Sequence, residues 1–192
     1  RENNALVKTA IATVSATVSE NKVYLINPVG GSHSTSFSAD NVYKIRILRK
    51  GNGYTLQYAK LTATTFSSLD IVKDNKFNYN FISLADSKAV NVEPEKSNWD
   101  IIWTWSLYYG TTTGGQYLYG FSDLVFTNTL GGVTSAEVLT STKSYADFSE
   151  ADLANMSFST KSNLIGENWR VTTGTGIKDD RFYLIKDASG NV

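Results

Sequence analysis

Alternation of apolar and polar residues is the feature that most constrains the fold of this chain. Residues 43–47 (YKIRI) and 54–58 (YTLQY) place apolar side chains at every second position. The turn-forming sequence KGNG lies between them at 50–53. Because successive side chains of a strand point to opposite faces, this pattern predicts a β-hairpin that pairs roughly 42–49 with 54–61.

The same period of two recurs along the chain and predicts an all-β, largely antiparallel structure of the sandwich type with one or two short helices. A helix is expected after Ser149, because Ser149 and Asp152 have the spacing of a capping box. Residues 5–17 are rich in Thr and Val and favour a strand. Further strands are expected at 22–27, 77–84, 99–109, 116–126, 134–140, 169–173 and 181–186.

The length of the chain and the scattered positions of its prolines and glycines favour a single domain over residues 1–192. Only 2 prolines and 14 glycines are present, and they are spread along the 192 residues without forming a linker. A hydrophobic fraction of 41% against 19% charged residues is typical of a chain that folds around a core.

The charge balance excludes several classes of partner. Eighteen basic residues match eighteen acidic ones, so no positive surplus is available to bind a phosphate backbone, and nucleic acid is not an expected partner. No apolar run approaches the ~20 residues that a membrane-spanning helix needs. The chain has no cysteine, which excludes disulfides and thiolate metal sites.

The residues needed for catalysis are scarce, and we expect a protein that is not an enzyme. A hydrolytic triad needs a base, usually histidine, to activate its nucleophile. His33 is the only histidine of the chain, and it lies in the loop-like sequence GGSHS. Carboxylate pairs occur at Glu93/Glu95 and Asp179/Asp180, in polar sequence typical of a solvated surface. A glycan-acting enzyme is the least favoured alternative, since carboxylate separation in space decides that chemistry.

Residues 99–109 (WDIIWTWSLYY) form the most informative segment. In a strand, the odd positions make a large apolar wall, and the even positions place hydroxyl groups at Thr104, Ser106 and Tyr108 on the opposite face. We expect Trp99, Trp103 and Trp105 to be buried in the core, since large aromatic side chains are highly buried on average. A ligand would then lie on the hydroxyl face.

Four segments carry a family resemblance: 79–104 (YNFISLADSKAVNVEPEKSNWDIIWT), 108–115 (YYGTTTGG), 164–169 (LIGENW) and 180–187 (DRFYLIKD). Together they resemble the HmuY family of haem-capturing bacterial surface lipoproteins, and the resemblance extends over residues 40–192. It implies an HmuY-like β structure with a haem cleft at one end. It also implies a location at the outer-membrane surface or outside the cell, and transfer of haem to a TonB-dependent outer-membrane transporter.

The resemblance also points to the candidate ligand-binding residues. Family members hold the iron with two axial His or Met side chains; the first position falls on Thr104 and the second near 128–135 (NTLGGVTS). Neither position has His, Met, Cys or Tyr, and threonine is not a usual haem ligand, so the identity of a metal ligand is left open. The candidate ligand-binding residues are Thr104, Ser106, Tyr108, Tyr109, Asn128 and Thr129, of which the two tyrosines could ligate iron.

Two functions follow from the sequence. The first is a haem-acquisition lipoprotein that binds a haem- or porphyrin-like ligand. The alternative is an HmuY-like binding module that has lost haem ligation and binds another small molecule or a partner protein. At the chain's end, strand 181–186 and a turn at 187–191 lead us to expect a returning strand after Val192, removed or carried by a separate chain.

Overall fold

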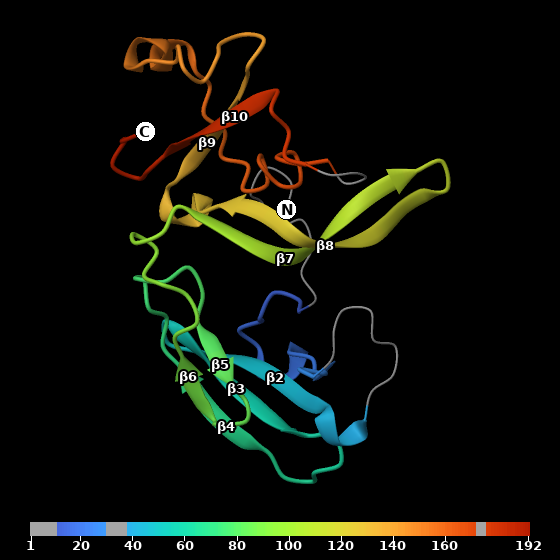
Figure 1. Cartoon of the computed structure of the whole chain (residues 1–192). Coiled ribbons are helices and arrows are strands. Elements are labelled where there is room, and N and C mark those ends of the chain that lie inside the picture. Colours follow the sequence, from blue (N-terminus) through green and yellow to red (C-terminus); the bar gives the residue numbers. More distant parts are fainter. Residues whose placement is uncertain (1–10, 30–37, 172–175) are drawn as a thin grey trace. The chain divides into compact units, whose positions relative to one another are not determined.

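The structure is a computed structural model that describes residues 11–29, 38–171 and 176–192 (Figure 1). At residues 108–112, 116, 118 and 119 it describes the backbone alone. The chain divides into two compact units, 8–94 and 95–192, called here the N-terminal and the C-terminal unit. Each is described by itself, and the expected single domain over 1–192 stays a prediction.

The N-terminal unit is built on a four-stranded antiparallel sheet in sequential order. Its core is formed by Ile45, Leu56 and Tyr58, which are buried and come from the two central strands. The two 3-10 helices of this unit are η1 (Val18–Glu20) and η2 (Ala39–Asn41). The sheet strands are β1 (Tyr24–Ile26), β2 (Tyr43–Lys50), β3 (Gly53–Lys60) and β4 (Ser67–Ile71), and a separate hairpin contains β5 (Phe81–Ser83) and β6 (Lys88–Val90).

The alternating residues around the KGNG turn form the expected hairpin. Strands β2 and β3 pair from Tyr43 opposite Lys60 to Lys50 opposite Gly53. Gly51 adopts a φ of 52°, in the left-handed region that glycine tolerates without steric cost. The hairpin places the apolar positions Ile45 and Leu56 on the buried side of the sheet.

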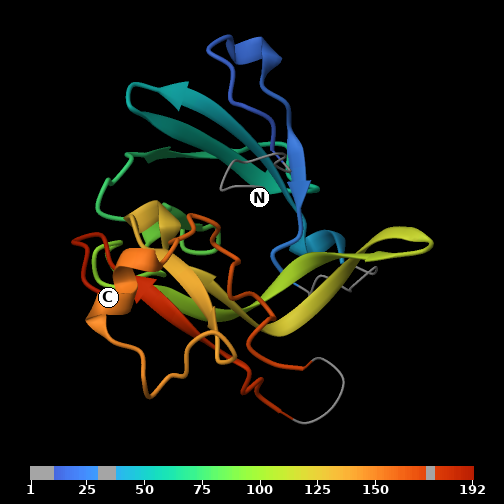
Figure 2. The ribbon, with the colours of Figure 1, turned by 90° about the horizontal axis from the view of Figure 1, so that it is seen from above.

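The C-terminal unit contains two antiparallel pairs of strands (Figure 2). The longest strands of the chain, β7 (Ile101–Thr112) and β8 (Gly115–Thr127), form one pair, called here the β7–β8 ribbon. The other pair is β9 (Thr134–Leu139) with β10 (Arg181–Lys186). Two 3-10 helices, η3 (Thr129–Gly131) and η4 (Glu150–Asn155), complete this unit.

The core of the C-terminal unit lies at the end of the ribbon nearest β9. Leu124 of β8 is 0% exposed, and other buried apolar residues are Val133, Ala136, Val138 and Ile165. The buried hydroxyl of Thr127 donates a hydrogen bond to Ser135 Oγ at 3.1 Å, which satisfies two polar groups inside this core.

A polar network joins β9 to β10 across the pair. Arg181 Nη1 lies 2.9 Å from Glu137 Oε2, and the Tyr183 hydroxyl donates a hydrogen bond to the same oxygen at 3.2 Å. Burial, followed by the negative charge of Glu137, raises the pKa of Tyr183 to about 12. The phenol therefore stays protonated, and able to donate, through the neutral pH range.

The all-β, largely antiparallel class expected from the sequence is confirmed, while several details differ. The capping box at Ser149 is present, since the Asp152 carboxylate accepts from Ser149 N at 2.7 Å, although the helix that follows is 3-10. Strands β4 and β6 were not expected. The strand predicted at 169–173 is wrong over 169–171, which form a turn with one isolated bridge between Arg170 and Ile177.

The predictions for the two ends of the chain have different outcomes. Residues 11–17 form no regular strand, and the rest of the 5–17 prediction lies outside the described residues. The turn at the other end is confirmed, because Asp187 Oδ1 accepts from both Ser189 N and Asn191 N at 2.8 Å. Strand β10 pairs with β9 along its whole length.

The burial of Leu124 makes a prediction about stability. We expect Leu124→Ala to lower the free energy of unfolding by about 2–5 kcal/mol, because it removes a fully buried side chain and leaves a cavity. The matched change Trp103→Ala, on the neighbouring strand, should cost less, about 0.5–1.5 kcal/mol, since it removes mainly exposed surface and one edge-to-face ring contact. Chemical denaturation measures both, and a larger cost for Trp103→Ala would contradict this packing.

Candidate functional site

The register of the β7–β8 ribbon decides which side chains share a face. Thr104 lies opposite Leu124 and Ser106 lies opposite Phe121, so one residue of β7 faces two residues of β8 between these pairs. This irregularity is a β-bulge, and it lies beside Trp105. Side chains directly opposite one another in an antiparallel pair lie on the same face of the ribbon.

The two faces of β7 are therefore those expected from the sequence. Thr104 shares a face with the buried Leu124, and Trp103 shares the opposite face with Val125. We call the second face, together with the ring that contacts it, the indole surface; it comprises Ile101, Trp103, Trp105, Leu107 and Trp169.

The expected burial of the tryptophans is wrong for two of the three. Trp103 is 69% exposed and Trp105 is 46% exposed, while Trp99 is half-buried. The periodicity identified which residues share a face, but it contains no information on which face the rest of the chain covers. The core forms against Leu124, on the other face of the ribbon.

The indole surface is held in place by contacts to the segment after η4. The rings of Trp103 and Trp169 meet edge to face with their centroids 6.0 Å apart. Trp169 Nε1 donates to the backbone oxygen of Asp123 at 3.1 Å, and Arg170 forms an ion pair with the Asp123 carboxylate at 2.5 Å. Aromatic pairs of this geometry contribute about 0.5–1.5 kcal/mol beyond the area they bury, so this contact stabilises the position of the Trp103 ring.

The hydroxyl face contains two of the candidate residues whose side chains the structure describes, Thr104 and Ser106. Thr104 and Ser106 are half-buried, and the Thr104 hydroxyl donates to the backbone oxygen of Trp105 at 3.3 Å. Tyr108 and Tyr109 pair with Tyr119 and Leu118 through the backbone, and their side chains lie outside the described residues. The structure brings Thr104 and Ser106 together on one face, and their role as ligand contacts stays a prediction.

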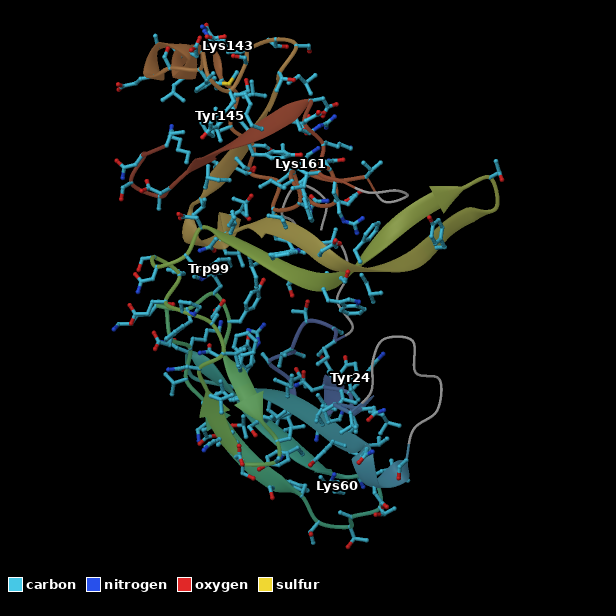
Figure 3. All side chains as sticks on the ribbon, in the orientation of Figure 1. Tyr24, Lys60, Trp99, Lys143, Tyr145 and Lys161 are labelled. Carbon is cyan, nitrogen blue, oxygen red and sulfur yellow. The ribbon has the colours of Figure 1, made fainter. Side chains whose placement is uncertain are left out.

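Asn128 and Thr129 lie at the other end of the ribbon, where β8 leads into η3. The Asn128 amide is 2% exposed and donates to the backbone oxygens of Lys96 and Trp99, each at 2.8 Å. Its Oδ1 accepts from Gly131 N at 3.0 Å, which caps η3. Figure 3 shows Trp99 just before the start of β7. Asn128 thus joins the segment entering β7 to the end of β8, a structural role that the sequence did not reveal.

The described part of the chain does not gather other chemistry-bearing residues into a metal site. Among the described residues, no group of three or more His, Cys, Asp or Glu side chains could hold a metal ion. Met156 is half-buried at the end of η4, and His33 lies outside the described residues. Glu93 accepts from Tyr79 N, while Asp180 pairs with Arg181. No helix in the described part of the chain has the length and hydrophobicity needed to cross a bilayer.

Comparison with known proteins gives no match to a protein-family model, to a curated protein or to a solved structure.

The hydrogen bonds of Asn128 lead to a prediction that tests whether this residue stabilises the fold. We expect Asn128→Ala to lower the free energy of unfolding by about 1–3 kcal/mol, because the carbonyl groups of Lys96 and Trp99 lose a donor. Thr129→Ala, at the next position, is the control and should cost less, since Thr129 is only half-buried. Equal costs for the two variants, measured by thermal and urea denaturation, would contradict the structural role.

Proposed function

We propose that this chain is a non-catalytic binding protein that captures a flat, apolar ligand of the porphyrin type on the indole surface of β7. The observation that supports the proposal most strongly is the exposure of Trp103 and Trp105 beside Ile101 and Leu107. Exposed apolar patches of this kind mark interaction sites in soluble proteins, because leaving them in water is unfavourable. Two indole rings on one strand offer a planar ligand large, weakly polar contact surfaces.

The resemblance to the HmuY family supports haem as the ligand and the cell surface as the location. In that proposal the chain is an outer-membrane surface or secreted lipoprotein that hands its ligand to a TonB-dependent receptor. The 164–169 segment of that resemblance contributes Trp169, whose ring meets Trp103. Residues remote from each other in sequence thus meet at one surface, as a binding site requires.

The second candidate is an HmuY-like module that has lost haem ligation and binds another small molecule or a partner protein. The observation that favours it is the chemistry of position 104. A threonine hydroxyl that already donates to the backbone of Trp105 is a poor replacement for an axial His or Met. Under this candidate the indole surface would bind a ligand other than a porphyrin, and neither haem nor metal-free protoporphyrin would bind.

A titration with ferric haem and with metal-free protoporphyrin, followed by absorbance, tests the proposal. We expect both to bind with similar affinity and without a six-coordinate low-spin Soret band, because the indole surface offers stacking and no strong axial ligand. Trp103→Ala and Trp105→Ala should each weaken binding about tenfold, as expected for loss of an aromatic contact worth about 1.4 kcal/mol.

Two control variants make the titration decisive. Phe66→Ala removes an exposed aromatic ring on the N-terminal unit and should leave porphyrin binding unchanged. Thr104→His places a strong iron ligand on the hydroxyl face, and we expect no gain in haem affinity from it. A gain accompanied by a low-spin spectrum would put the ligand on the hydroxyl face, and absence of porphyrin binding in the parent protein would reject the proposal.

A further inference from the structure

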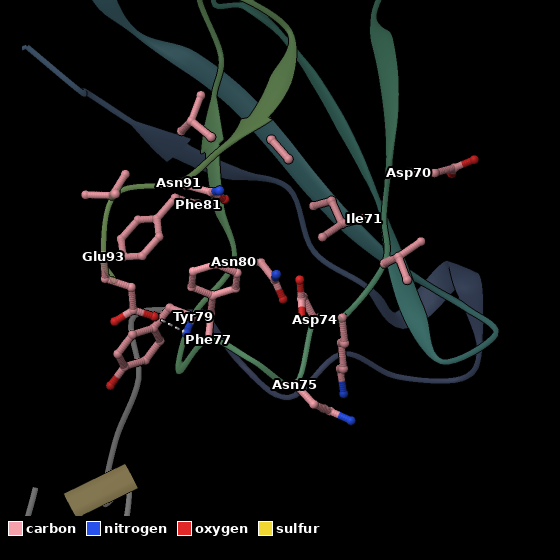
Figure 4. Close-up of a pocket in the computed structure, with 15 residues that line it drawn as sticks. Asp70, Ile71, Asp74, Asn75, Phe77, Tyr79, Asn80, Phe81, Asn91 and Glu93 are labelled. Atoms are coloured by element: carbon pink, nitrogen blue, oxygen red, sulfur yellow. Dashed lines mark hydrogen bonds between the residues drawn. The ribbon is translucent and has the colours of Figure 1, made fainter. Parts of the chain in front are cut away.

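A cleft in the N-terminal unit has no part in the function proposed above. It has a volume of about 500 Å³, and all its lining residues come from the segments 70–75, 77–81 and 89–93 (Figure 4). The first segment ends β4, the second leads into β5 and the third leaves β6, so one unit supplies the whole cleft. Its volume lies in the range of about 300–1,000 Å³ that is typical of small-molecule sites.

Aromatic rings form one wall of this cleft. Tyr79 and Phe81 meet edge to face with their centroids 6.2 Å apart, and Phe77 lies beside them in Figure 4. Tyr79 is 47% exposed, whereas Phe77 and Phe81 are half-buried. The mutual contact orders the rings, and the exposed part of Tyr79 is available to the apolar face of a ligand.

Planar polar side chains surround the rings. The amides of Asn75, Asn80 and Asn91 line the cleft, and each is exposed. Two carboxylates lie among them and are fixed by the backbone, since Glu93 Oε1 accepts from Tyr79 N at 2.8 Å and Asp74 Oδ1 accepts from Lys76 N at 2.9 Å. Amides supply donors and acceptors and carboxylates supply acceptors, a set that matches neighbouring hydroxyl groups.

The charge of the lining selects against anionic ligands. The residues that line the cleft include three carboxylates, those of Asp70, Asp74 and Glu93, and one ammonium group, that of Lys73. Asp70 is engaged by Lys50 and by Thr55, whose hydroxyl donates to it at 2.7 Å. The remaining carboxylates repel phosphate and carboxylate groups, which argues against an anionic ligand. The amides and the aromatic wall suit a ligand that is rich in hydroxyl groups and has one apolar face.

We propose that the cleft lined by Phe77, Tyr79, Phe81, Asn91 and Glu93 binds a neutral carbohydrate. The C–H face of a sugar ring lies against Tyr79, and its hydroxyl groups exchange hydrogen bonds with the amides and with Glu93. The site is independent of the indole surface, so the chain binds glycan and the apolar ligand through different residues. A protein that operates at a cell surface would meet both kinds of molecule.

Isothermal titration calorimetry of the full chain with cellotriose, maltotriose, mannotriose and chitotriose tests this site, with choline as a cationic probe. We expect at least one trisaccharide to bind and choline to give no heat. Tyr79→Ala and Asn91→Ala should each weaken that sugar about tenfold. Glu93→Gln, which keeps an acceptor for Tyr79 N, should weaken it less.

The controls keep this test separate from the porphyrin titration. Phe66→Ala lies on the same unit outside the cleft and should leave sugar affinity unchanged. Tyr79→Ala should also leave porphyrin binding unchanged, and circular dichroism should show that it retains the parent fold. Absence of binding by all four sugars, binding of choline alone, or sugar binding that Tyr79→Ala does not weaken would each overturn the proposal.

Discussion

The pairing of β7 with β8 is the interaction on which the proposed function depends. It fixes two faces along the longest strands of the chain, and the buried Leu124 lies on one of them. The indoles of Trp103 and Trp105 lie on the other face, where they are 69% and 46% exposed. The bulge beside Trp105 increases the local twist of the ribbon and directs the side chains there differently from those of a regular pair.

Contacts to other segments of the C-terminal unit hold the ribbon at two places. At one end, Asn128 joins the segment entering β7 to the end of β8 through two backbone carbonyl groups. Near the bulge, the ion pair of Arg170 with Asp123 and the hydrogen bond from Trp169 join the ribbon to a segment more than forty residues away. An ordered surface loses little conformational entropy on binding, which favours affinity for a rigid planar ligand.

The sequence predicted the fold class, the β2–β3 hairpin and the two faces of β7, because a period of two is a local property of a strand. Burial of Trp103 was predicted wrongly, since coverage depends on long-range packing. The short strands β4 and β6 were missed because residues 67–71 (SSLDI) and 88–90 (KAV) contain too few alternating positions to stand out. Asn128 was predicted as a ligand-binding residue from the family resemblance. Its buried hydrogen bonds join segments that are distant in the sequence, so only the structure revealed them.

The central claim is that a flat ligand lies on the indole surface, and fluorine NMR of 5-fluorotryptophan-labelled protein tests it most directly. The chain has four tryptophans, so the resonances of Trp99, Trp103, Trp105 and Trp169 can be assigned by single Trp→Phe changes. During titration with diamagnetic, metal-free protoporphyrin, ring currents should shift Trp103 and Trp105 strongly, Trp169 less and Trp99 least. Shifts absent from Trp103 and Trp105, or largest at Trp99, would contradict the account.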